Sequence, residues 1–167
     1  KTIECDVEMT KASNGFWLHQ PFDLLLLVSI EIQILEEKTK AIHSLGYNCI
    51  DINKELSAAL INIPPNDRSR AVYPWLIEAL RKCQSTPVFL IGIDLLFLPS
   101  LQLDPFRLLR DVARITPLSV LWLGEYSANT LTYAIPEHNH YRSWTLNASL
   151  LQQPKVVIHS ISNPKGE

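Results

Sequence analysis

The sequence predicts an α/β domain: a mostly parallel five-stranded sheet, helices on both faces and an added β-hairpin. Short apolar runs typical of buried strands recur along the chain, and the gaps between several of them carry helical patterns, as crossovers between parallel strands require. A length of 167 residues with 47% hydrophobic residues fits one domain with a substantial core. The five expected strands of the parallel sheet are Leu24 to Val28, Cys49 to Ile52, Val88 to Ile93, Leu118 to Leu123 and Val156 to Ile158.

The first crossover is expected to be a helix that ends at Gly46, a usual C-terminal stop. Its apolar residues fall on one helical face: Ile30, Ile34, Leu35, Ala41, Ile42 and Leu45. After the second strand, Asn53 is expected to cap a short helix from Lys54 to Leu60, closed by Pro64 and Pro65.

A polar turn from Asn66 to Arg70 then leads to a helix around Trp75 to Arg81, before the third strand. Asp104 followed by Pro105 predicts an N-cap and first helical position, with the helix running to about Arg114.

Beyond the fourth strand, two β-rich segments flank a polar turn, which predicts a hairpin at residues 130–147. Residues 1–20 are expected to form an N-terminal extension, and residues 163–167 a disordered tail.

Charge and composition argue against a protein that acts mainly by binding nucleic acid or by spanning a membrane. A net charge of −2 and a pI near 6.2 argue against a dominant nucleic-acid-binding surface, which needs clustered Lys and Arg. The early apolar run, Leu24 to Val28, is too short to span a bilayer. Three widely separated cysteines, Cys5, Cys49 and Cys83, suit reduced thiols. We therefore expect a soluble cytoplasmic protein that does not act at a membrane.

The third strand and its continuation, VFLIGIDLLF from Val88 to Phe97, resemble a Walker B strand. Asp94 is then the candidate metal-binding acid, because doubly wound sheets place such carboxylates at the carboxyl ends of strands. A capping role for Asp94 is the alternative. The chain contains no G-x-x-x-x-G-K-[ST] motif, although such a loop should follow Ser29, which we take as a candidate nucleotide contact. From Leu24 to Gly46 there is no glycine before Gly46 and no lysine before Lys38.

Residues from about Leu24 to Trp144 resemble the BrxF family, small P-loop-type proteins of BREX phage-exclusion systems. The matching stretches occur in the family's order: Gly46-Tyr47, Asp51 to Ser57, Ile63-Pro64-Pro65, Arg68, Asp94 to Phe97, Pro99 to Leu101, Asp104 to Leu109, Trp122 to Glu125, Leu131 to Ala134, Pro136, His138 and Tyr141-Arg142.

The resemblance implies a RecA-like P-loop NTPase fold, a role in antiviral defence, and ATP and Mg²⁺ as cofactors. Partners would be other phage-defence proteins or further copies of the chain. Glu125, just past the fourth strand, is a candidate for orienting water or sensing phosphate, with an ordinary loop position as the alternative. Arg114 is a candidate arginine finger. The Walker A lysine and hydroxyl expected of this family are absent from the sequence, and ATP hydrolysis by the chain alone would require them.

Three hypotheses follow. The chain is a pseudo-NTPase assembly subunit that lacks the phosphate loop, or an active ATPase whose loop is missing from the sequence between Ser29 and Ile30. A third class is a DNA-binding adaptor, in which Arg107, Arg110 and Arg114 form a basic stripe. A solvated helix face is the simpler reading of that stripe.

Glu137, His138 and His140 lie within four residues, but a metal site needs a third well-placed ligand that the sequence does not identify. We therefore predict a surface histidine pair at the hairpin tip, and no metal site.

Overall fold

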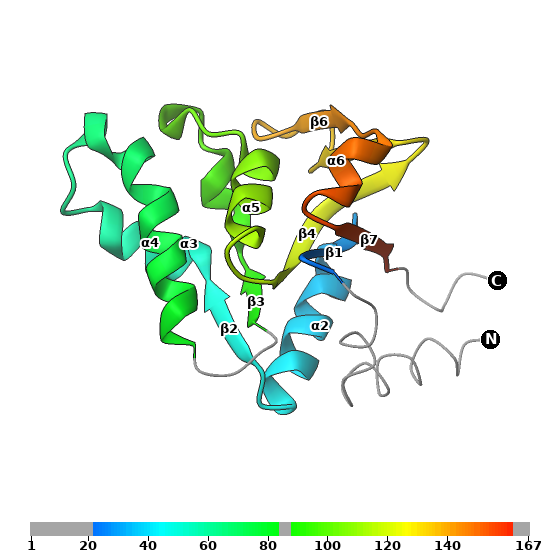
Figure 1. The fold of residues 1–167 in the computed structure, drawn as a ribbon, viewed down its shortest axis with the longest axis horizontal. Coiled ribbons are helices and arrows are strands. Elements are labelled where there is room, and N and C mark those ends of the chain that lie inside the picture. The colour runs from blue at the N-terminus through cyan, green and yellow to red at the C-terminus, as the bar shows by residue number, and fades with distance from the viewer. Residues whose placement is uncertain (1–21, 84–87, 162–167) are drawn as a thin grey trace.

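The computed structural model describes residues 22–83 and 88–161 (Figure 1). The expected extension at 1–20 and tail at 163–167 lie outside the described residues, as do Cys5 and Ser85 to Pro87. The strands are β1 (Leu24–Ser29), β2 (Asn48–Asp51), β3 (Val88–Ile91), β4 (Leu118–Ser127), β5 (Thr130–Tyr133), β6 (Arg142–Thr145) and β7 (Val156–Ser160).

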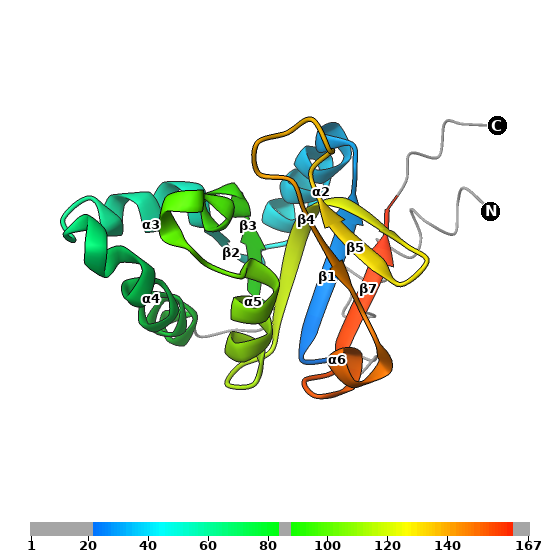
Figure 2. The same ribbon diagram turned by 90° about the horizontal axis from the view of Figure 1, so that it is seen from above.

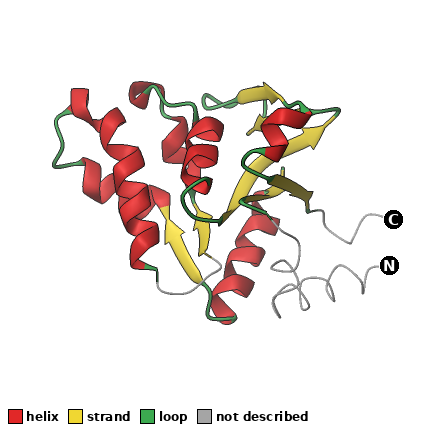
Figure 3. Ribbon diagram, in the orientation of Figure 1, coloured by secondary structure: helices red, strands yellow, loops and turns green. Residues whose placement is uncertain are grey.

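Helices connect most of these strands (Figure 3). The α-helices are α2 (Ile32–Ser44), α3 (Ile52–Leu60), α4 (Arg68–Lys82), α5 (Pro105–Ala113) and α6 (Ala148–Gln152), and the 3₁₀ turns are η2 (Pro65–Asp67), η3 (Ile93–Phe97) and η4 (Pro99–Leu101).

Five strands form a parallel sheet in the order β2-β3-β4-β1-β7, which confirms the α/β class and the expected mostly parallel sheet. β3 and β4 are hydrogen-bonded neighbours near its centre, with Phe89 opposite Ser119. The expected hairpin is confirmed as β5 and β6, but β5 also pairs with β4. That pairing extends β4 to Ser127, four residues beyond the expected end at Leu123.

Helices cover both faces of the sheet, as predicted (Figure 2). β1 is buried along its whole length, so its alternating side chains supply both cores. Leu25 and Leu27 pack in the same cluster as α2, whereas Leu24 and Leu26 join the larger cluster that contains residues of α3, α4 and α5.

Several helix boundaries differ from the predicted ones. α2 buries Ile34, Leu35 and Ile42 as expected, but Ile30 and Leu45 lie outside the helix and are 52% and 47% exposed. α4 begins at Arg68, so the expected turn at 66–70 was wrong in part. The helix continues through Pro74, whose missing N–H and bulky ring usually stop a helix.

Candidate functional site

The connection between β1 and α2 consists of Ile30 and Glu31. Ser29 is buried, and its hydroxyl is used within the turn: it accepts from the Glu31 N–H at 3.1 Å and donates to the Glu31 carbonyl at 3.4 Å. The same carbonyl accepts from the N–H groups of Ile34 and Leu35. The Ser29 hydroxyl, predicted to contact a nucleotide, therefore already bonds to the backbone of the turn that precedes α2.

This connection lacks the features of a phosphate cradle. A cradle needs successive N–H groups turned inward, a conformation that glycines permit, and Ile30, Glu31 and Ile32 are not glycines. Ile30 and Ile32 are 52% and 58% exposed, and Glu31 brings a negative charge to the start of α2. The hypothesis that a loop is missing between Ser29 and Ile30 stays a prediction, which sequencing the gene would test.

Asp94 lies just beyond the carboxyl end of β3, on η3 rather than at the strand's last residue. Gly92 takes a left-handed conformation, with φ of 56°, and redirects the chain after Ile91. Asn53 fixes this bend: its N–H donates to the Gly92 carbonyl at 2.8 Å, and its Oδ1 accepts from the Leu95 N–H at 2.7 Å.

The predicted cap of α3 was therefore wrong. Asp51 is the N-cap, and its carboxylate accepts from the Lys54 N–H at 3.2 Å. Asn53 lies inside the first turn of α3, where its side chain holds η3 instead. Both residue types cap helices well, so local sequence does not separate the two roles.

The Asp94 carboxylate is held by two side chains from the added hairpin and the loop that follows β5. Its Oδ1 accepts from the Tyr133 hydroxyl at 3.2 Å and lies 3.0 Å from the Nδ1 of His140. Burial, reinforced by the negative charge of Asp94 and by their hydrogen bond, raises the pKa of Tyr133 well above its usual range. Tyr133 therefore remains a protonated donor to Asp94.

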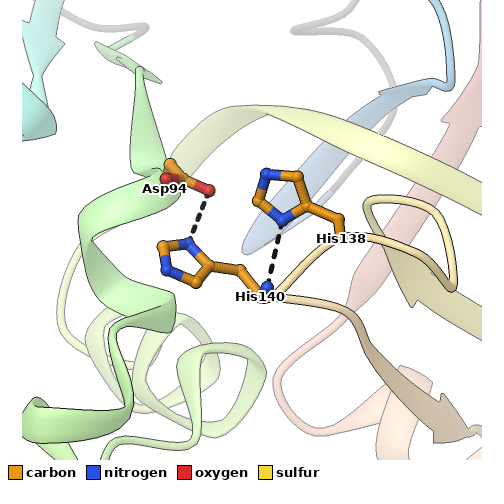
Figure 4. Close-up of side chains that lie close together, drawn as sticks. All are labelled: Asp94, His138 and His140. Atoms are coloured by element: carbon orange, nitrogen blue, oxygen red, sulfur yellow. Dashed lines mark hydrogen bonds and ion pairs between the residues drawn. The ribbon is translucent and has the colours of Figure 1, made fainter.

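His138 completes a cluster with Asp94 and His140 (Figure 4). Its Nδ1 accepts from the backbone N–H of His140 at 3.0 Å, and the two imidazole rings lie 5.3 Å apart between centroids. One ligand-type atom from each of the three residues lies within 4.8 Å of the other two. The cluster joins η3 to the loop between β5 and β6, and it meets the minimum donor count of a metal centre.

The predicted surface histidine pair is wrong in one respect. His138 is exposed, but His140 is half-buried against Asp94, so the two histidines are not simply a surface pair. The third side chain of the cluster is that of Asp94, which the sequence pattern predicts as a candidate Walker B acid with a capping role as the alternative. Glu137 is exposed and is not a member of this cluster.

Glu125 does not lie on a loop past the fourth strand, because it is a residue of β4. Glu125 is exposed and pairs with Thr132 of β5, whose hydroxyl accepts from the Glu125 N–H at 3.2 Å. Position 125 therefore belongs to the antiparallel extension of the sheet.

The three arginines of the predicted stripe have different surroundings: Arg107 and Arg110 lie in α5, and Arg114 is its C-cap. Arg107 is exposed, whereas the guanidinium groups of Arg110 and Arg114 both reach the Gln153 carbonyl, at 3.3 and 3.5 Å. Burial, together with the nearby charge of Arg114, lowers the pKa of Arg110. Arg110 also places its guanidinium 5.8 Å from the centre of the Phe106 ring. Two of the three residues in the predicted basic stripe thus bind α5 to the residue preceding Pro154.

The fold and the site together define an α/β protein with a mostly parallel sheet and a side-chain cluster where β3 ends. No protein-family model, curated protein or solved structure matches the chain. Among the described residues, no helix has both the length and the apolar character needed to cross a membrane.

Proposed function

We propose that this chain is a RecA-like subunit of a BREX-like phage-defence complex that assembles with larger partners without hydrolysing ATP. The proposal combines the resemblance to the BrxF family with the geometry at the carboxyl ends of the strands. It treats the nucleotide-binding body as a scaffold whose phosphate loop has degenerated.

The sheet topology supports the RecA-like part of the proposal. In the dinucleotide-binding and flavodoxin-like folds, the first strand lies beside the second. Here β1 lies between β4 and β7, and both β3 and β4 separate it from β2. That order disfavours both of those α/β classes, and the adjacency of β3 and β4 agrees with the expected RecA-like core.

The observation that carries the proposal is the two-residue connection from β1 to α2. Its serine hydroxyl already bonds within the turn, its exposed side chains are apolar or acidic, and no lysine is present. Across the same edge of the sheet, Asp94 is bound to Tyr133 and His140. A triphosphate would therefore lack the glycine-rich turn and the lysine that normally bind it.

Co-expression with the other proteins of a BREX-like system tests this function. We expect the chain to co-purify with at least one of them, in equal amount with and without Mg²⁺ and ATP. The purified chain alone should release no phosphate from ATP above a buffer control. Failure to associate with any of these proteins would refute the assembly role, and ATP hydrolysis at a rate that scales with protein concentration would refute the scaffold reading.

A further inference from the structure

The cluster of Asp94, His138 and His140 has a composition that a scaffold role does not explain. Two imidazoles and one carboxylate converge from segments more than forty residues apart, because His140 and Asp94 are 46 residues apart in the chain. A hydrogen bond between Asp94 and His140 would by itself need no second histidine. We infer that these three side chains bind one divalent transition-metal ion of the Zn²⁺ class.

The donor set selects the type of ion. Zn²⁺ is bound by histidine nitrogens and carboxylate oxygens, and protein sites with three such ligands keep a fourth position for water or another group. Mg²⁺ and Ca²⁺ prefer sets made of oxygen atoms, whereas imidazole suits zinc, copper, nickel and iron. The two histidines beside Asp94 therefore favour a transition metal over the Mg²⁺ of a nucleotide site.

The spacing of the donors leaves a small adjustment for binding. Ligands about 2.0–2.2 Å from a tetrahedral ion lie roughly 3.5 Å from one another. The donor atoms of the cluster already lie within 4.8 Å of each other, and the most exposed of the three residues, His138, is the one that can turn inward. The ion would replace the direct contact of 3.0 Å between His140 Nδ1 and Asp94 Oδ1.

Neighbouring residues hold the carboxylate in position. Tyr133 donates to Asp94 from a ring that stacks on Phe97, with ring centroids 3.5 Å apart and planes at 10°. Phe97 lies on the same 3₁₀ turn as Asp94, and both aromatic residues are buried. Hydrogen-bond partners of this kind orient metal ligands and raise the affinity of the site.

The ion would tie the added hairpin to the sheet. Asp94 follows β3, while both histidines lie between β5 and β6, so one metal ion would cross-link two segments that are far apart in the chain. The inference concerns the metal alone and does not depend on the proposed partners or on nucleotide.

Isothermal titration of the full metal-free chain with Zn²⁺, in a non-thiol reductant, tests the inference. In His138→Ala we expect the binding of one equivalent of ion to be lost, or its affinity to fall at least about tenfold. Replacing even a residue that only hydrogen-bonds to a metal ligand commonly lowers metal affinity about 10–100-fold. His138 is exposed, so this variant should keep the fold. Mg²⁺ should give no binding that depends on His138.

His43→Ala is the matched control, since His43 is an exposed histidine on α2 outside the cluster. Its zinc binding should equal that of the wild-type chain. Co²⁺ substitution should give the intense visible absorption of a four-coordinate site in the wild-type and His43→Ala proteins, and lose it in His138→Ala. Zinc binding that is absent from the wild-type protein, or identical in all three proteins, would overturn the inference.

Discussion

Replacing Gly92 by alanine should destabilise the protein through two separate effects. Gly92 has φ of 56°, a left-handed conformation that costs a residue with a Cβ about 1–2 kcal/mol. An added Cβ would also lie 2.6 Å from Oδ1 of Asp51, so that the Asp51 side chain must turn away. Turning it away breaks its bond to the Lys54 N–H, and losing such an N-cap costs about 1 kcal/mol.

Together the two effects predict a loss of about 2–3 kcal/mol in the free energy of unfolding. For a chain of this size, that loss corresponds to a fall in Tm of roughly 5–10 °C. Urea denaturation followed by far-UV circular dichroism measures the free energy directly.

Gly46→Ala is the matched control. Gly46 also has a left-handed φ, of 78°, but nothing lies within 4 Å of the position that its Cβ would occupy. The free energy of unfolding of Gly46→Ala should fall only by the backbone contribution, about 1–2 kcal/mol. Equal losses in the two variants would refute the contact with Asp51, and a neutral Gly92→Ala would refute the described bend itself.

Three further predictions concern other parts of the fold. Asp104→Ala should lower the free energy of unfolding by about 1–2 kcal/mol in urea, because Asp104 caps α5 and accepts from the Trp144 indole, and an unchanged value would contradict that double role. Trp122→Phe should cost about 1–3 kcal/mol, since the buried indole donates to the Thr132 carbonyl at 2.8 Å; a variant as stable as wild type in the same assay would argue against this anchor of β5. Burial raises the pKa of Cys49, so its alkylation rate should begin to rise at a higher pH than the rate of an unstructured cysteine peptide. Alkylation by iodoacetamide, followed by peptide mass spectrometry, measures the midpoint of each pH profile. A midpoint for Cys49 at or below that of the peptide would show that the thiol is not shielded. Because the folded pKa is the higher one, this thiol should also make folding less stable as the pH rises above the unfolded pKa.

Local patterns predicted much of the parallel core. The five apolar runs correspond to β1, β2, β3, β4 and β7, because strands that are buried on both faces consist of short runs of consecutive apolar residues. Asp104 and Pro105 marked the start of α5 correctly, since an N-cap bond spans only three residues.

Features that depend on distant contacts were not predictable in this way. Asn53 bonds to Gly92 and Leu95 instead of capping α3, and only the folded structure brings these two residues beside it. β4 extends past Leu123 because β5 pairs with it. The third member of the histidine cluster, Asp94, comes from another strand's end, and no local spacing reveals it.

Binding of a fluorescent ATP analogue in the presence of Mg²⁺, followed by anisotropy, tests the central claim most directly. The β1 to α2 connection has neither the glycine-rich backbone nor the lysine that bind a triphosphate, so we expect no saturable rise in anisotropy. A saturable rise that unlabelled ATP reverses would contradict it.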